Sequence, residues 1–319
     1  MLFAYQIEGD KLARMAPEAD LAAATWIDLY RPMPPQSAAV AALGIEVPSL
    51  DEMEEIEISA RLYRNAGTEV MTVVVPGLST SKAPMAGPVT FILAPERLVT
   101  VRHHAPRPFE TFPARADRSG PGCSSPDRIF LGLIEEIIGR LADLMEGTGR
   151  ALDDIARTVF GGQTGKNGAV LKEALVSIGR EGELLGRVRL CLLTLERALS
   201  YFSQIAEGRP GTKALNPFIK GATRDIQALG VHADFLSARV SLATDATLGM
   251  ISLAQNDTVR ILSVIAALFL PPTLIASAYG MNFVNMPELA QPWGYPAALA
   301  LMAGSAVVTW VILKWRRWI

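Results

Sequence analysis

Cysteine, catalytic residue pairs and clustered basic residues are scarce in this chain, and each scarcity excludes a kind of site. The 319 residues include two cysteines, Cys123 and Cys191, whose separation matches no metal-ligand spacing. Ordinary thiols in a reducing compartment are therefore expected. The net charge is −2 and no run of lysine or arginine is present, which argues against nucleic acid as a partner. No nucleophile and base form a recognisable pair, so neither catalysis nor a bound cofactor is expected.

Charge itself is missing from the C-terminal part of the chain. Residues 261–287 and residues 289–313 carry no charged side chain, and only Glu288 separates them. Each stretch holds an apolar segment close to the roughly 20 residues that a helix needs to cross a bilayer. The sequence therefore predicts a transmembrane domain of two helices over residues 256–319.

The residues that flank these spans predict their orientation. Arg260 precedes the first span, and the connecting loop has no lysine or arginine. Three basic residues follow the second span: Lys314, Arg316 and Arg317. Because positive flanks stay on the cytoplasmic side, both termini are expected in the cytoplasm. The N-terminal residues show no basic segment followed by a long apolar one, so no cleaved signal peptide is expected.

Residues 1–122 are expected to form a cytoplasmic domain of mixed helices and strands. Strands rich in β-branched residues are predicted at four places: 26–29, 69–75, 89–93 and 98–101. A helix is predicted over 51–63, because Ser49 and Glu52 have the spacing of a capping box at its start. The segment 106–126 is rich in Pro, Gly, Ser and Arg and is interpreted as a linker or mobile loop.

Residues 123–255 are expected to form a cytoplasmic stalk of long helices. Apolar residues recur every three or four positions, which predicts helices over about 126–160 and 169–206. Residues 218–270 contain no proline. A single helix of about 80 Å is therefore predicted to run from the stalk into the first membrane span.

Small and polar residues recur along the first span at intervals of three, four or seven positions: Asn256, Ser263, Ala266, Leu270, Thr273 and Ser277. This spacing places them on one face of a helix. A ring of several copies could line an aqueous pore with that face. The alternative is that small residues let membrane helices pack closely.

The loop between the spans contains Tyr279-Gly280-Met281-Asn282-Phe283. A ring of Asn282 amides at the outer end of a pore could hold the waters around a cation, and Mg²⁺ sheds its waters reluctantly. The alternative role for Asn282 is a helix C-cap. The residues alone leave both roles open.

Gly280-Met281-Asn282 resembles the Gly-Met-Asn signature of the CorA family of divalent-cation channels. The continuation Met286-Pro287-Glu288-Leu289 is similar to the magnesium/cobalt branch, and so are the segments 26–29 and 269–274. The resemblance extends over essentially the whole chain. It implies a funnel-shaped homopentamer with an α+β cytoplasmic domain, long stalk helices and two transmembrane helices per subunit. The first span of each subunit would line one central pore.

The resemblance also implies roles for individual residues. The selectivity filter would be Gly280, Met281 and Asn282. The pore lining and its hydrophobic gate would be Asn256, Val259, Leu262, Ser263, Ala266, Leu270 and Thr273. Asp225 would belong to a regulatory metal site. Val284 stands where relatives often have an acidic residue, so Glu288 alone supplies acidity to the outer loop.

The resulting hypothesis is a channel for potential-driven uptake of Mg²⁺, with Co²⁺ and Ni²⁺ as secondary ions, that cytoplasmic Mg²⁺ closes. Its partners would be other copies of the chain, these cations and the lipid bilayer. One alternative is a zinc or other divalent-cation transporter of the same superfamily. The other is a membrane-anchored sensor or scaffold whose spans only tether the soluble part.

Overall fold

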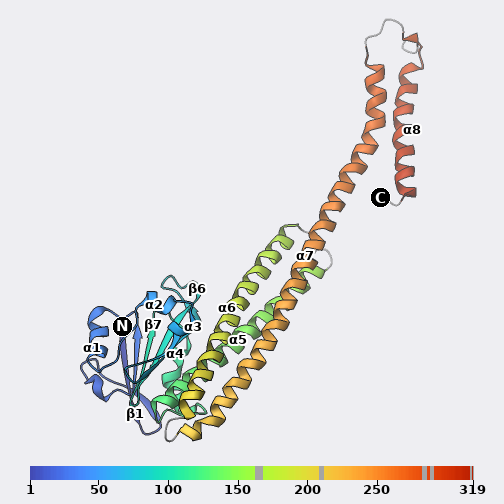
Figure 1. Ribbon diagram of the computed structural model, residues 1–319. Helices are drawn as coiled ribbons and strands as arrows, with labels where there is room; N and C mark the ends of the chain where they lie inside the picture. Colours follow the sequence, from blue (N-terminus) through green and yellow to red (C-terminus); the bar gives the residue numbers. More distant parts are fainter. Residues whose placement is uncertain (162–167, 208–211, 282–285, 288–290, 317, 319) are drawn as a thin grey trace. The chain divides into compact units, whose positions relative to one another are not determined.

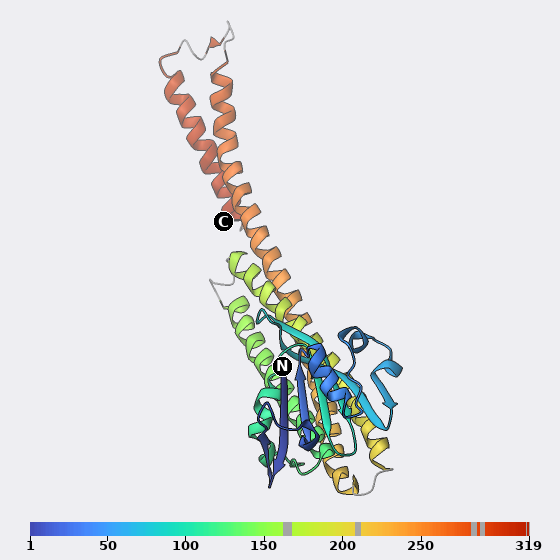
Figure 2. The same ribbon diagram turned by 90° about the vertical axis from the view of Figure 1, so that its left-hand side faces the viewer.

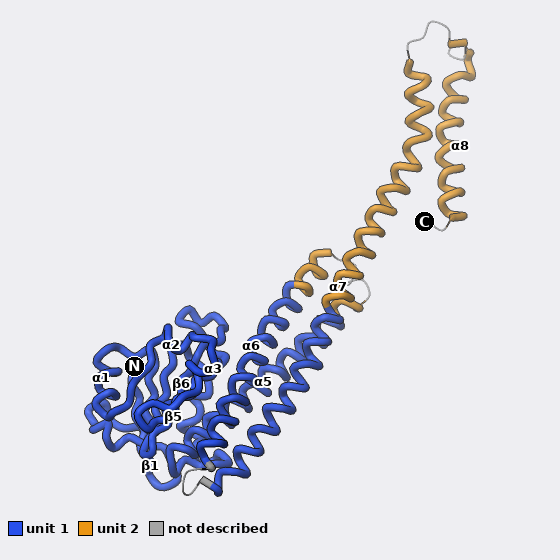
Figure 3. Tube along the Cα trace, in the orientation of Figure 1, with its two compact units in different colours: residues 1–156, 176–243 blue, residues 157–175, 244–319 orange. Residues whose placement is uncertain are grey.

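The computed structural model describes residues 1–161, 168–207, 212–281, 286–287, 291–316 and 318. The chain divides into two compact units, which Figure 3 shows in different colours. Unit 1 consists of Met1–Ala156 and Val176–Ala243, and unit 2 consists of Arg157–Leu175 and Thr244–Ile319. Three long helices contribute residues to both units: α5 (Pro126–Phe160), α6 (Gly168–Glu207) and α7 (Asn216–Tyr279).

Unit 1 contains a seven-stranded sheet in the order β2-β1-β3-β7-β6-β5-β4. Its strands are β1 (Leu2–Glu8), β2 (Lys11–Arg14), β3 (Trp26–Tyr30), β4 (Leu62–Asn65), β5 (Thr68–Leu78), β6 (Pro84–Leu93) and β7 (Leu98–Arg102). The pairing of β3 with β7 is parallel, and the other pairs are antiparallel. The four strands predicted from the sequence are thereby confirmed as parts of β3, β5, β6 and β7.

The sheet is covered on both faces because side chains alternate along each strand. One face holds an aliphatic cluster with Ile27, Val99 and Ile92, to which α1 (Pro34–Ala41) and α2 (Leu50–Glu54) contribute Val40 and Met53. The other face meets α5 and α6 through aromatic rings. The Phe91 ring lies 5.2 Å from that of Phe130 on α5, and Phe130 lies 4.9 Å from Phe202 on α6. Figure 1 shows the sheet between these two sets of helices.

The edge of the sheet is closed by α6. Strand β4 pairs with β5 only as far as Met71, so the backbone of Val74 lies beyond the paired region. The Val74 N–H donates instead to the Thr194 hydroxyl of α6 at 3.0 Å. A further bond joins the Tyr201 hydroxyl of α6 to the Glu69 carboxylate at 3.0 Å. These contacts satisfy polar groups that an open edge would leave exposed.

The helix predicted over 51–63 is wrong in extent. The capping box is confirmed, because Ser49 and Glu52 bond reciprocally at the start of α2. However, α2 ends at Glu54, α3 spans Ile58–Arg61, and the chain then enters β4. The residues of β4 pair with β5 through a tight turn in which Ala66 and Gly67 both have positive φ. Pairing within the sheet outweighs the local preference for helix.

The linker predicted at 106–126 is also wrong. The segment forms α4 (Pro108–Thr111), η2 (Phe112–Ala114) and η3 (Ala116–Arg118), and it packs on the sheet. Phe109 and Phe112 are buried with ring centroids 6.5 and 5.9 Å from that of Trp26. Two aromatic residues therefore anchor a segment whose Pro and Gly content suggested a linker.

The long helices agree with the predicted ones. Helix α5 has the expected bounds, α6 extends the prediction by one residue at each end, and α7 is continuous over 64 residues. Within unit 1 these helices lie side by side, as Figures 1 and 2 both show. Ion pairs join Arg239 of α7 to Asp153 of α5 and Arg189 of α6 to Asp234 of α7. The other helical segments are η1 (Leu21–Ala23), η5 (Thr212–Leu215) and α8 (Gly294–Trp315).

Candidate functional site

Two helices have the length and apolar character needed to cross a membrane, namely the segment Lys213–Tyr279, which includes α7, and α8. In the most apolar stretch of α7 no residue is buried. In the most apolar stretch of α8 only 6% of the residues are buried. Large side chains such as Phe269 and Leu274 are 68% and 70% exposed. A helix with so much exposed apolar surface requires lipid or another protein surface around it.

The C-terminal part of α7 has two different faces within unit 2. Half-buried residues gather on one side of this part of the helix: Val264, Ala267, Leu268, Pro271, Pro272, Ile275 and Tyr279. Helix α8 runs alongside this part of α7 in Figures 1 and 2, and its own half-buried row includes Ala298, Ser305 and Thr309. Small residues on α8 therefore occupy the side where the two helices approach each other.

The stripe predicted from the sequence lies on the opposite face of α7. Every member of it is exposed: Asn256, Ser263, Ala266, Leu270, Thr273 and Ser277. Val259 and Leu262, which the resemblance adds as gate residues, are exposed as well. At 100° per residue these positions centre roughly half a turn away from the half-buried row. The structure thus places the predicted residues together on one face, and that face is not covered by α8.

The hydroxyl groups on this stripe are bonded to the helix itself. Ser263 Oγ donates to the Val259 carbonyl at 2.8 Å, and Thr273 Oγ1 donates to the Phe269 carbonyl at 2.7 Å. Their oxygen lone pairs remain available as acceptors, which suits contact with water or a hydrated cation. Pro271 and Pro272 supply no N–H to the carbonyls four residues earlier, so this part of α7 carries extra acceptor capacity.

The Gly-Met-Asn segment begins directly after the end of α7. The Gly280 N–H donates to the Ala276 carbonyl at 2.9 Å, and Met281 is 49% exposed. A Cβ atom at position 280 would approach the Ala276 oxygen to 3.2 Å, which favours glycine there. Asn282, Val284 and Glu288 lie outside the described residues, so their predicted roles remain predictions.

Asp225, the candidate for a regulatory metal site, is exposed on the part of α7 that belongs to unit 1. It lines a cavity of about 480 Å³ in which Glu135 is the other carboxylate. Among the described residues, no three His, Cys, Asp or Glu side chains gather as a metal site would require. A single subunit therefore offers Asp225 without a complete ligand set within the part of the chain that the structure covers.

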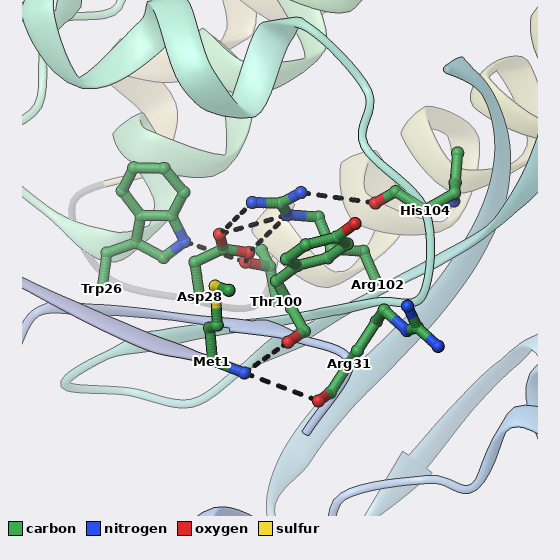
Figure 4. A network of polar contacts seen from close by, with 8 residues as sticks. Met1, Trp26, Asp28, Arg31, Thr100, Arg102 and His104 are labelled. Carbon is green, nitrogen blue, oxygen red and sulfur yellow. Dashed lines mark hydrogen bonds and ion pairs between the residues drawn. The ribbon is translucent and has the colours of Figure 1, made fainter. Parts of the chain in front are cut away.

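A buried ion pair that sequence reasoning missed lies on the sheet face toward α5 (Figure 4). Asp28 and Arg102 are 2% and 4% exposed, and Arg102 Nη2 donates to Asp28 Oδ2 at 2.9 Å. Thr100 donates to Asp28 Oδ1 at 2.8 Å, and the Trp26 indole N–H donates to Thr100 at 3.1 Å. The Arg102 guanidinium lies 4.5 Å from the centre of the Tyr30 ring. The signal was present in the sequence as charged residues inside two apolar strands.

The two adjacent histidines at the end of β7 are held neutral by their surroundings. His104 is 2% exposed, and its Nε2–H donates to the Val75 carbonyl at 2.7 Å, whereas Nδ1 has no hydrogen-bond partner. Burial and the nearby Arg102 charge lower the pKa of His104, and burial also lowers the pKa of His103. These imidazoles serve packing in the sheet domain.

Other buried groups of unit 1 have pKa values raised by burial. Cys191 is completely buried, which raises the pKa of its thiol. Cys123 is buried as well, and neither cysteine forms a disulfide. Burial and the bond to Glu69 raise the pKa of Tyr201 to about 12. The thiols therefore stay protonated and unreactive near neutral pH, as the sequence predicted for ordinary cysteines.

The described residues thus include an α/β sheet domain and two exposed apolar helices long enough to be candidate membrane spans. The family model described as CorA-like Mg2+ transporter protein matches residues 22–316. The chain belongs to this family. Its members are transporters by description and not enzymes.

Curated relatives match the whole chain. The magnesium transport protein CorA of Escherichia coli (strain K12) is 31% identical over 323 residues, and that of Yersinia pestis is 30% identical, with both chains completely covered in each case. Among solved structures, the CorA magnesium transporter from Methanocaldococcus jannaschii has a TM-score of 0.74 at 16% identity, covering 100% of this chain and 99% of that one. The full-length CmaX protein has a TM-score of 0.68, also at 16% identity, with 99% and 97% covered. These structural likenesses support the fold.

Proposed function

We propose that this chain forms a homopentameric channel for Mg²⁺ in a bacterial inner membrane. The observation that carries the proposal is the exposed stripe of α7, which lies opposite the face that approaches α8. In a ring of subunits that stripe would face a shared axis, and α8 would lie outside it. Relatives named magnesium transport protein, which match over the full length, support Mg²⁺ as the ion.

The membrane potential supplies the driving force. Moving one elementary charge across a membrane is worth about 2.3 kcal/mol per 100 mV, so a divalent ion gains about 4.6 kcal/mol on entry. This corresponds to roughly three decades of concentration, since about 1.4 kcal/mol is tenfold. Uptake then needs no ATP, but it does need a means of closing the pore. Co²⁺ and Ni²⁺ are proposed as secondary ions because they resemble hydrated Mg²⁺ in charge and coordination.

The proposed pathway starts at Asn282, where a ring of neutral amides would hold the waters of the ion without stripping them. Three exposed apolar side chains of α7 would form the gate by excluding water from a narrow pore: Val259, Leu262 and Leu270. Cytoplasmic Mg²⁺ would close the gate by bridging Asp225 to groups of a neighbouring subunit. It can do so only by binding the closed state more tightly than the open one.

The proposed topology places both termini in the cytoplasm, because Arg260 and Lys314 flank the two spans on the same side. In this arrangement residues 1–122 form the cytoplasmic α/β domain and residues 123–255 the stalk. Residues 256–319 then form the transmembrane domain. Glu288 from each subunit would give the outer mouth a ring of carboxylates that attracts cations.

The test is Mg²⁺ entry into liposomes that contain the purified protein and an imposed inside-negative potential. The protein as it stands is expected to conduct Mg²⁺, and Asn282→Ala is expected to abolish flux. Asn216→Ala, the same change at the start of α7 in unit 1, serves as the matched control and retains flux. Equal flux through both variants would contradict the assignment of Asn282 to the filter.

The two alternatives give different results in the same vesicles. A zinc transporter would carry Zn²⁺ in preference to Mg²⁺, and a proton-coupled one would respond to a pH gradient. A scaffold would give no flux of any divalent ion, and Asn282→Ala would then change nothing. Crosslinking and mass measurement of the detergent-solubilised protein test the pentamer separately, because a monomeric chain cannot enclose the proposed pore.

A further inference from the structure

A cavity of about 320 Å³ lies in unit 1 between the segment 107–119 and helix α5. Four guanidinium groups line it: Arg107, Arg115, Arg118 and Arg140. Two carboxylates also line it, those of Glu135 and Glu136. Four positive and two negative side chains leave a charge excess of +2 around the cavity.

The two carboxylates are already engaged within the protein. Glu136 accepts a hydrogen bond from the Thr111 hydroxyl at 2.7 Å and pairs with Arg115 at 3.3 Å. Glu135 accepts a bond from the Gly120 N–H at 3.2 Å. The Glu136 charge is therefore paired with that of Arg115. The other three arginines that line the cavity are Arg107, Arg118 and Arg140.

Those remaining arginines have little to neutralise them. Within the described part of the chain, no carboxylate lies within 4.0 Å of the side-chain nitrogens of Arg107 or Arg118. Arg140 reaches Asp143 only at 4.0 Å. Arg107 and Arg118 are thus two exposed guanidinium groups that line one cavity without a carboxylate partner. A bound anion would supply the missing counter-charge.

A second cavity, of about 700 Å³, shares Arg107 and Arg140 with the first. It adds two arginines, Arg180 and Arg187, and three carboxylates, Glu110, Glu181 and Glu183. Glu183 is paired with Arg187, and Glu181 accepts a hydrogen bond from Thr148. The lining also includes a set of apolar side chains: Pro76, Leu78, Pro84, Met85, Leu144 and Leu184. The two shared arginines make the cavities neighbours in unit 1. The positive excess of two therefore lies around the first cavity, whereas the second combines apolar surface with arginines and carboxylates.

We propose that these joined cavities bind a nucleoside triphosphate, with its phosphates among the arginines and its base against the apolar lining. Guanidinium groups bind phosphate oxygens in pairs of parallel hydrogen bonds, which gives both strength and orientation. Inorganic phosphate would use only the first cavity, whereas a nucleotide uses both. The proposal does not depend on the transport activity, because the site lies entirely within unit 1.

Gly139 offers a way to block the site without removing a charge. It lines the first cavity, and a Cβ atom built there meets nothing within 4 Å. A leucine at this position would project into the open space, and it favours helix by roughly 0.8 kcal/mol or more over glycine. Gly147 is also within α5 and likewise has open space around it, so Gly147→Leu is the matched control.

The experiment is calorimetric titration of the full-length protein in detergent with ATP, tripolyphosphate or adenosine. The buffer contains EDTA, so that divalent ions neither chelate the triphosphate nor bind the transporter. ATP is expected to bind, tripolyphosphate to bind about tenfold more weakly, and adenosine alone to show no measurable binding. Each pair of guanidinium–phosphate bonds that is lost is expected to weaken ATP binding about tenfold or more.

Two variants are compared with their controls. Arg118→Gln and Gly139→Leu are expected to weaken ATP binding by about tenfold or more, whereas Arg150→Gln and Gly147→Leu leave it unchanged. Arg150 lies on α5, as Gly139 does, and its side chain is 68% exposed. It pairs with Glu146, and neither residue lines either cavity. Equal loss of ATP binding in Arg118→Gln and Arg150→Gln would overturn the proposal, because general surface charge would then explain the binding.

Tripolyphosphate that binds as tightly as ATP would overturn the assignment to a nucleotide. Absence of ATP binding at millimolar concentration would overturn the site itself. None of these results alters Mg²⁺ flux through liposomes, so failure here and failure of the channel hypothesis are distinguishable.

Discussion

The helices of unit 1 bury their apolar side chains, whereas the C-terminal helices of unit 2 expose theirs. Phe130 and Phe202 of unit 1 are completely buried, but Phe269 of unit 2 is 68% exposed. Phe130 and Phe202 therefore pack within the chain, whereas most of the Phe269 surface is not covered by the described residues. Burial at about 25 cal/mol per Å² stabilises unit 1 from within, whereas the exposed helices of unit 2 require lipid or another protein surface for the same gain.

Asp28→Ala should produce the largest effect on unit 1. It leaves the Arg102 guanidinium, which is 4% exposed, without its carboxylate, and breaking a buried pair in this way costs about 3–5 kcal/mol. A drop of that size in the free energy of unfolding, measured by urea titration in detergent, is expected. Arg150→Ala, which breaks an exposed pair with Glu146, is the control and should change the value by less than about 0.5 kcal/mol.

Phe130→Ala and Phe269→Ala compare the two regions directly. Phe130 packs between Phe91 and Phe202, so its loss leaves a cavity and should cost about 3–5 kcal/mol of unfolding free energy. Phe269 has no such packing within the chain, and its loss should lower the unfolding free energy of unit 1 by less than about 0.5 kcal/mol. Similar losses in both variants would mean that the contrast in burial does not determine stability.

Acidification should weaken unit 1 through His104. The folded state lowers the pKa of this imidazole below 6.5, so the unfolded chain takes up the proton first as the pH falls. Stability is thus fully present above about pH 6.5 and declines below it, toward the lowered pKa of the folded state. The Tm between pH 7.5 and 5.5 should fall more in the wild type than in His104→Gln. His103 shifts in the same direction, so the double variant should show the smallest decline.

Ser49→Ala should lower the stability of unit 1 by less than Asp28→Ala or Phe130→Ala does. The Ser49 hydroxyl accepts a bond from the Glu52 N–H, and Glu52 bonds back to Ser49, which lowers the pKa of that carboxyl. Losing such a cap costs about 1 kcal/mol. Because the folded pKa of Glu52 is lowered, its contribution is present above about pH 4.5 and is lost as the pH falls below that value. Urea titrations at pH 7 and pH 4 measure both parts, and a variant equal to wild type would exclude the cap as a stabilising feature.

The sequence predicted those parts of the fold whose pattern is local and long. Helix α5 has its predicted bounds because a regular apolar stripe from Ile129 onward begins beside Pro126 and ends before Gly161. The long helix through Leu270 was predicted for a similar reason, since proline is absent along most of it. The Ser49 capping box was predicted because it depends on two residues three positions apart.

The rest depends on contacts between distant residues. Residues 62–65 form a strand because β5 is available beside them, and no local pattern contains that information. The segment 106–126 packs on the sheet because Trp26, about 80 residues earlier, offers a surface to Phe109 and Phe112. The residues of the α7 stripe, from Asn256 to Ser277, share one exposed face as helical periodicity predicted, whereas their role in lining a pore stays a prediction. In the proposed pentamer, other copies of the chain would determine what lies opposite that face.

Helix α7 also imposes an order on biosynthesis. The core of unit 1 includes Ile226, Ala233 and Leu236 of this helix, so it cannot be completed until they have left the ribosome. The first uncharged stretch begins at Ile261, only 25 residues after Leu236. Because translation adds about 5–20 residues per second, these 25 residues take only seconds to make. The α7 residues that complete the core of unit 1 and the first hydrophobic span therefore emerge almost together. A nascent chain delayed at that point would expose the incompletely packed core and the uninserted span at the same time.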